Sequence, residues 1–253
     1  MTQKATKSVE IETIQIRQGV LKCYVLGTTP LILNRPSQKV REGLLLPPKR
    51  KNRNEKETTL KHDPLEEYRA SPYTLADGPS LLAMPVTAFK SAMRSAAIDM
   101  PGASKAEIGR LTYLEGEYAP IYGVPLMSMM MVRSADMNRT PDIRTRAIVP
   151  AWATRLCVRF TMPMLTDRVV ANLLAAAGLI RGVGDFRPEK GAGNFGQFEL
   201  VDAGDKRLKQ IMASGGRAAQ TAAMETPAHY DQETADLFSY WSAEATRRGL
   251  RAA

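Results

Sequence analysis

Five glycines lie within the fifteen residues from position 182 to position 196, and this cluster constrains the fold more than any other stretch of the chain. The glycines are Gly182, Gly184, Gly191, Gly193 and Gly196, with Arg187 and Lys190 among them. Glycine loses more backbone entropy on ordering than other residues, so a run of glycines indicates a need for positive φ or for close backbone approach. Successive N–H groups in such a loop can form a concave site for phosphate. We therefore expect an anion-binding loop here.

The segments on either side restrict what this loop can be. Upstream, apolar residues from Val169 to Ala177 recur at helical spacing, whereas 197–201 alternates like a strand. The order is helix, loop, strand. A dinucleotide fingerprint needs strand, loop, helix, and a Walker loop needs Gly-Lys-Ser/Thr, so both are excluded. Two interpretations remain: a loop that contacts phosphate, and a turn that only lets a helix pack against its sheet.

The charge of the chain favours a polyanionic partner. Lys and Arg number 35 against 26 Asp and Glu, which gives a net charge of +9 and an isoelectric point near 9.6. A balance of this kind is typical of nucleic-acid-binding proteins, although a basic surface can also be incidental. Cys23 and Cys157 are too few for a disulfide framework, and with only two histidines we predict no zinc site and no cofactor.

No signal peptide and no apolar run of about 20 residues is visible, so we expect a cytoplasmic protein without a membrane partner. Two β-rich blocks, 19–100 and 117–202, each contain one helical pattern. They predict an α+β fold with a ferredoxin-like, RRM-like antiparallel sheet, long inserted loops and a C-terminal helical tail.

The expected organisation has three parts. Residues 1–18 form a flexible lead-in, and residues 19–202 form the core. Within the core, 47–62 is a basic insert and 133–141 is a long connection. Residues 203–253 form a polar linker followed by a helix, in which Phe238 and Trp241 could dock on a neighbouring surface.

Basic residues outside the glycine loop fall into three groups that we predict to contact nucleic acid. The insert carries four, the helix that begins near Pro85 carries two, and alternating arginines on two strands form a stripe that can follow a phosphate backbone. These residues are Lys49, Arg50, Lys51 and Arg53; Lys90 and Arg94; and Arg144, Arg146, Arg155 and Arg159.

Two motifs resemble those of the RAMP superfamily, the repeat-associated proteins of CRISPR systems. Met84-Pro85-Val86-Thr87-Ala88-Phe89-Lys90-Ser91-Ala92-Met93-Arg94 is similar to the Ile-Pro-Gly-Ser-Ser-Leu-Lys-Gly-x-x-Arg helix start of that superfamily. Residues 182–198 resemble its glycine-rich loop, and the likeness extends to phage-encoded proteins. The resemblance implies an RRM-like core, long inserted loops, RNA binding through backbone contacts, and head-to-tail assembly with other subunits of an effector complex.

The chain also departs from that pattern. Val86 and Thr87 replace Gly-Ser at the helix start. The segment 27–36 contains no acidic residue, whereas the RNA-cleaving relatives carry an aspartate there. The processing endonucleases of the superfamily use a histidine, for which His62 and His229 are the candidates.

Three hypotheses follow. The favoured one is a non-catalytic protein that binds single-stranded nucleic acid, RNA above DNA, without sequence readout and that self-associates along the strand as a helix or ring. The second is a metal-independent endoribonuclease that uses His62 or His229. The third is a phage structural or assembly protein.

Overall fold

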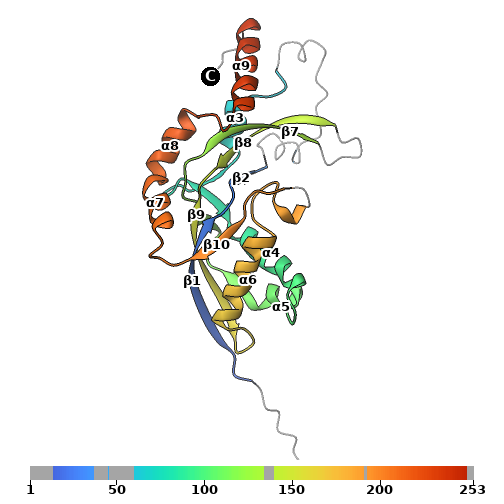
Figure 1. Cartoon of the computed structure of the whole chain (residues 1–253), viewed down its shortest axis with the longest axis vertical. Helices are drawn as coiled ribbons and strands as arrows, with labels where there is room; N and C mark the ends of the chain where they lie inside the picture. Colours follow the sequence, from blue (N-terminus) through green and yellow to red (C-terminus); the bar gives the residue numbers. More distant parts are fainter. Residues whose placement is uncertain (1–13, 37–44, 46–59, 134–139, 191–192, 250–253) are drawn as a thin grey trace, which may run out of the picture.

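The structure is a computed structural model that describes residues 14–36, 45, 60–133, 140–190 and 193–249 (Figure 1). A four-stranded sheet with the strand order β10-β1-β9-β5 forms its centre. Its strands are β1 (Arg17–Gly27), β5 (Thr112–Leu114), β9 (Ala153–Met162) and β10 (Phe198–Val201). Helix α4 (Val86–Ala96) connects β1 to β5, and α6 (Asp167–Ile180) connects β9 to β10. All neighbouring pairs are antiparallel, so the predicted ferredoxin-like core is confirmed.

Helices α4 and α6 cover one face of this sheet because their apolar residues recur every three to four positions. In β9 the side chains of Leu156, Val158 and Phe160 point to the helices and are buried. Phe198 of β10 completes this core against Phe89 of α4, with ring centroids 5.8 Å apart.

Two smaller sheets arise from segments inserted into the ferredoxin-like order. One has the order β2-β8-β7 and the other β3-β4-β6. Their strands are β2 (Leu31–Leu33), β3 (Tyr73–Thr74), β4 (Leu82–Pro85), β6 (Tyr118–Pro120), β7 (Leu126–Arg133) and β8 (Pro141–Val149). The inserted helical elements are α3 (Pro64–Ala70), η1 (Ala97–Asp99) and α5 (Lys105–Leu111).

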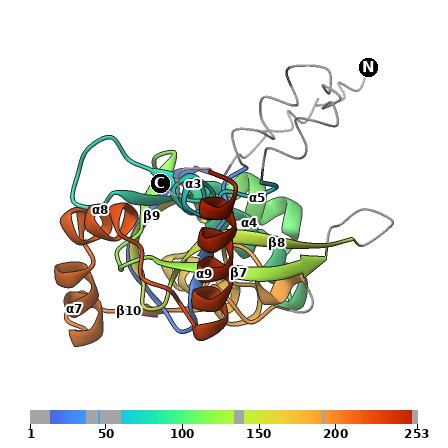
Figure 2. The same ribbon diagram turned by 90° about the horizontal axis from the view of Figure 1, so that it is seen from above.

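The C-terminal region differs from the expected linker. Residues after β10 form α7 (Lys206–Ser214), α8 (Arg217–Glu225) and α9 (Gln232–Arg247), and Figure 2 shows α7 and α8 beside the sheets and α9 crossing β7. The amide of Gln220 in α8 is buried where β4 begins and the chain leaves β6. Its oxygen accepts from the N–H groups of Leu81 and Leu82, and its nitrogen donates to the carbonyls of Ile121, Gly123 and Gly215. Together with Arg217, which donates to the carbonyls of Leu75, Gly78 and Ser80, this buried amide fixes a segment whose composition predicts a linker.

Several expectations fall on residues outside this description. They are residues 1–13 of the lead-in, 47–59 of the basic insert and 134–139 of the long connection. Strand β1 already begins at Arg17, inside the expected lead-in. Of the helices in the described ranges, none has the length and apolarity that crossing a membrane requires.

Candidate nucleic-acid interface

The glycine loop joins α6 to β10, and its backbone is held mainly by hydrogen bonds within the chain. The N–H of Val183 donates to Gly196, that of Asp185 to Ile32, and that of Gly196 to Pro30, at 2.8–3.1 Å. The N–H of Gln197 donates to the Thr29 hydroxyl at 2.9 Å. These N–H groups already have acceptors within the chain, so they are unavailable to the phosphate that the sequence predicts.

The glycines instead allow backbone segments to approach one another. Gly182, Gly184 and Gly196 have φ between +67° and +81°, where a side chain would be strained. A Cβ on Gly193 would collide with the carbonyl of Phe186, and one on Gly196 with that of Val183. For these residues the geometry favours the packing interpretation that the sequence left open. Gly191 lies outside the described residues.

An ion pair ties the loop to the β2-β8-β7 sheet. The Asp185 carboxylate binds the guanidinium of Arg146 in β8 and accepts from the Asn34 amide at 2.9 Å. The Arg146 side chain is only 6% exposed, and burial lowers its pKa although Asp185 partly offsets this effect. Arg146 is therefore a structural anchor of the loop. Its contact with nucleic acid stays a prediction.

Phe186 is the feature of this loop that sequence reasoning did not single out. Its φ is +51°, a left-handed conformation that is rare for an aromatic residue, and its side chain is 43% exposed. The Phe195 ring lies 6.0 Å away and supports it from within the loop. Such strain persists only where surrounding contacts impose it, and it concentrates at binding sites.

Two cations accompany Phe186 on the loop. Arg187 donates to Glu189 at 2.6 and 2.9 Å and to the Gly184 carbonyl at 2.9 Å, so it helps to shape the loop. Burial alone would raise the pKa of Glu189, but hydrogen bonds from Ser95 and Arg187 outweigh it and lower that pKa. Lys190, at the end of η2 (Pro188–Lys190), is exposed.

The predicted arginine stripe is divided between two sheets. Arg144 and Arg146 lie on β8, whereas Arg155 and Arg159 lie on β9, and these strands do not pair with each other. Arg144 is exposed, shares a face of β8 with Arg146, and so lies on the side of the strand that meets the glycine loop. Arg155 and Arg159 lie on the face of the core sheet opposite α4 and α6.

The basic residues of α4 are partly buried. Arg94 lies over Gly109 of α5, where an added Cβ would come within 2.8 Å of the Arg94 Nε. Lys90 is half-buried. The four cations of the basic insert, Lys49, Arg50, Lys51 and Arg53, lie outside the described residues.

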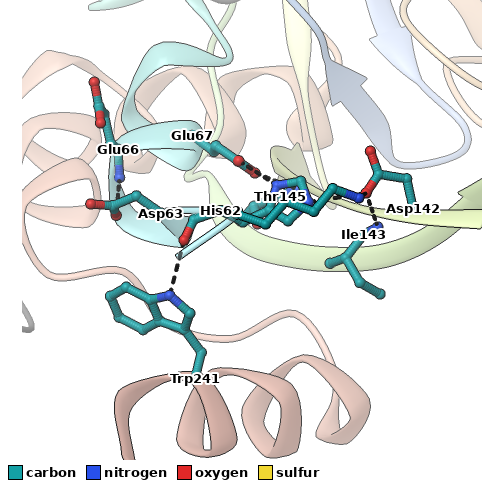
Figure 3. Close-up of polar contacts among 9 residues, drawn as sticks. His62, Asp63, Glu66, Glu67, Asp142, Ile143, Thr145 and Trp241 are labelled. Carbon is teal, nitrogen blue, oxygen red and sulfur yellow. Dashed lines mark hydrogen bonds and ion pairs between the residues drawn. The ribbon is translucent and has the colours of Figure 1, made fainter. Parts of the chain in front are cut away.

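His62, the first candidate for catalysis, lies between two carboxylates (Figure 3). Its Nδ1 is 2.7 Å from Glu67 Oε1 and its Nε2 is 3.0 Å from Asp142 Oδ1. Burial raises the pKa of Asp142, but hydrogen bonds from Lys61 and His62 outweigh it and hold that pKa below its ordinary value. The carbonyl of His62 accepts from Trp241 Nε1 at 3.1 Å, which joins α3, β8 and α9. Both ring nitrogens are thus committed to structural contacts.

His229, the second candidate, lies in a shallow groove of about 790 Å³ along α9. Its ring is 5.2 Å from Phe238, which in turn is 5.6 Å from Trp241. Phe238 and Trp241 therefore dock α9 on its own chain. Their rings connect His229, which packs against Phe238, to His62, whose carbonyl accepts from Trp241. Within the described ranges, no three His, Cys, Asp or Glu side chains are grouped to hold a metal ion.

Comparisons with known proteins give a structural likeness only. No family model matches the chain, and no curated protein matches it. Among solved structures, it is similar to a chain in a cryo-EM structure of the Type III-B Cmr-beta bound to cognate target RNA, with 14% identity and a TM-score of 0.40. The match covers 73% of this chain and 59% of the other, so this chain spans less than two thirds of that chain's length.

Proposed function

We propose that this chain binds single-stranded nucleic acid, RNA above DNA, through the face that carries the glycine loop, and that it does not cleave the bound strand. The observation that carries the proposal is Phe186, an exposed ring held in a strained conformation on the glycine loop. Aromatic rings bind unpaired bases by stacking, which is tolerant of sequence, while nearby cations bind the phosphates. Lys190 and Arg144 supply those cations. The net charge of +9 supports the same partner.

The test is a fluorescence-anisotropy titration with a labelled 20-nucleotide oligouridine. Replacing Phe186 with Ala should raise Kd by about fivefold or more, since one stacked base contributes roughly 1–3 kcal/mol. Phe186→Tyr should bind nearly as well as the unchanged protein because it keeps the ring. Tyr240→Ala is the matched control, since Tyr240 is a 74% exposed ring on α9. Equal affinity for Phe186→Ala and the unchanged protein would remove the stacking role.

The second part of the proposal is electrostatic. Binding should weaken steeply between 50 and 200 mM salt because each phosphate contact releases counterions. Lys190→Gln should reduce the slope of log K against log salt concentration by roughly 0.7, the value for one phosphate contact to a single strand. A titration that is flat with salt would contradict phosphate contacts altogether.

Self-association along the strand belongs to the same proposal. Negative-stain images of the protein on long single strands should show filaments or rings. Isolated monomers at a saturating concentration of strand would refute assembly but leave binding intact.

The ribonuclease alternative predicts that bound RNA is cleaved, whereas our proposal predicts that it is not. Labelled single-stranded RNA incubated with excess protein, with and without magnesium, should remain intact on a denaturing gel. The reason is that His62 is held by two carboxylates and His229 packs against Phe238. Specific products that disappear in His62→Gln or His229→Gln would establish the enzyme instead.

A further inference from the structure

A small notch opens at the end of the core sheet where β1 begins and β9 ends. Its volume is about 250 Å³, and its walls come from β1, β5, β9 and the end of α5. Strand β5 pairs with β9 only from Phe160 to Val158, so the last residues of β9 extend past β5 and leave this space. The glycine loop meets β1 and β2 at the other end of β1, where Gly196 donates to Pro30. The two regions are therefore separate.

Three arginines line the notch: Arg17 from β1, Arg110 from α5 and Arg159 from β9. Arg159 is already engaged, because it donates to Gln18 at 3.0 Å and to Glu115 at 3.1 Å. Arg17 donates to the neutral Gln15 amide at 2.9 Å. Among the described residues, neither Arg17 nor Arg110 has an acidic partner within salt-bridge distance. Within the part of the chain that the structure describes, the notch therefore carries two arginines that no carboxylate pairs with.

Tyr113 forms the outer wall of this site. It lies directly opposite Arg159 in the antiparallel pairing of β5 with β9, and its side chain is 57% exposed. At this exposure much of the ring surface is open to a ligand. A planar aromatic surface beside guanidinium groups matches a base beside its phosphate.

We infer that this notch binds one nucleotide, with its phosphate on Arg17 and Arg110 and its base stacked on Tyr113. The notch of about 250 Å³ is smaller than the roughly 300–1,000 Å³ typical of small-molecule pockets, so it would enclose part of one nucleotide and leave the rest exposed. Guanidinium groups bind phosphate in bidentate fashion, and Gln18 adds an amide close to the same wall. The inference does not depend on the glycine loop, because the notch shares no residue with it.

The test titrates uridine 5′-monophosphate into the full chain and monitors binding by the NMR chemical shifts of the backbone amides. The nucleotide should shift the amides of residues 112–114 and 16–18, whereas uridine without phosphate should shift them at least tenfold less at equal concentration. Arg17→Gln combined with Arg110→Gln should weaken binding about tenfold or more, since two charge-assisted contacts are lost. Tyr113→Ala should weaken it about fivefold, and Tyr113→Phe should restore it.

The control variant is Lys206→Gln combined with Lys209→Gln, which removes two exposed charges from α7, beside the other end of β1. It should bind the nucleotide like the unchanged protein. Absence of shifts at the notch amides, or shifts that persist in the Arg17/Arg110 variant, would overturn the site. Inorganic phosphate that binds as tightly as the nucleotide would overturn the stacking role of Tyr113. The oligouridine titration of the Phe186 variants reports separately on the glycine-loop proposal, so failure of one is distinguishable from failure of the other.

Discussion

The ferredoxin-like core and the half of the molecule built from inserts and C-terminal helices are stabilised in different ways. The core relies on apolar area: Phe198 alone contacts the rings of Phe89 and Trp152. The other half shares the same apolar cluster, in which Tyr68, Leu82 and Met127 are buried, and adds specific polar contacts such as the Gln220 amide and the Arg146–Asp185 pair. Apolar burial tolerates changes of shape, whereas a buried polar group is costly unless its partners are correctly placed. The inserted half should therefore open locally while the core remains folded.

The largest effect is expected in the core. Phe198→Ala removes a ring that is 2% exposed and should lower the free energy of unfolding by about 3–5 kcal/mol. Leu179→Ala is the control, since Leu179 is 70% exposed on α6 and should change stability by about 0.5 kcal/mol or less. Urea denaturation measures both. Equal effects of the two changes would mean that the core is not the stabilising part.

A smaller and more local effect is expected at Gln220. Gln220→Ala leaves two N–H groups and three carbonyls without their partner and should cost about 2–4 kcal/mol. Hydrogen exchange should accelerate in α8, β4 and β6 but not in β1 or β9. Gln210→Ala, at an exposed position on α7, should leave exchange unchanged. Uniform acceleration across the core would argue against local opening.

The ion pair of the glycine loop comes next. Asp185→Asn removes the partner of the buried Arg146 and should cost about 1–2 kcal/mol, less than a fully buried pair because the Asp185 side chain is 33% exposed. The matched change is Asp99→Asn, whose Arg181 partner is 20% exposed, and it should cost less. Thermal unfolding compares the two variants. A greater loss of thermal stability in Asp99→Asn would contradict the role of Arg146 as the structural anchor of the glycine loop.

The smallest effect is expected at the exposed end of α9. Hydrogen bonds from Arg247 and Arg248 lower the pKa of Glu244 from 4.5 to about 2. Because the folded-state pKa is depressed, the stabilisation is complete above pH 4.5 and is lost as pH falls from 4.5 through about 2. An NMR titration of the Glu244 carboxyl should give the low value, and Arg247→Gln should raise it. A midpoint near 4.5 in the unchanged chain would show that the pair does not form.

Sequence reasoning predicted the core because periodicity records apolar burial directly. Strand β1, helices α4 and α6, and β10 follow from that pattern, and their order gives the ferredoxin-like sheet. The inserted half was less predictable because polar contacts between distant segments leave no periodic signal. Alternation placed Arg146 beside Arg144 on one face, but only the partner from another element decides that one is buried and the other exposed.

The candidate sites show the same limit. The sequence predicted the loop between a helix and a strand, but not that many of its N–H groups would bond within the chain. Phe186 stands out only through its positive φ, which the sequence does not reveal. Helices α7 and α8 were not expected after residue 202, because an Ala- and Gly-rich stretch gives no sign that Gln220 will be buried. Tyr113 was not singled out because a strand of three residues is too short for a pattern.

The position of β1 between β9 and β10 has a consequence for biosynthesis. Among the strands of the core sheet β1 is made first, and it pairs only with residues 153–162 and 198–201, so both of its edges stay open until those segments have been made. Closing such long-range pairs is slow, and an unpaired strand can associate with other chains in the meantime. Helix α8 emerges later still, and only then can Gln220 pair with the backbone at the start of β4 and after β6. We therefore expect the nascent core sheet to need protection from aggregation until the chain has emerged from the ribosome past α8.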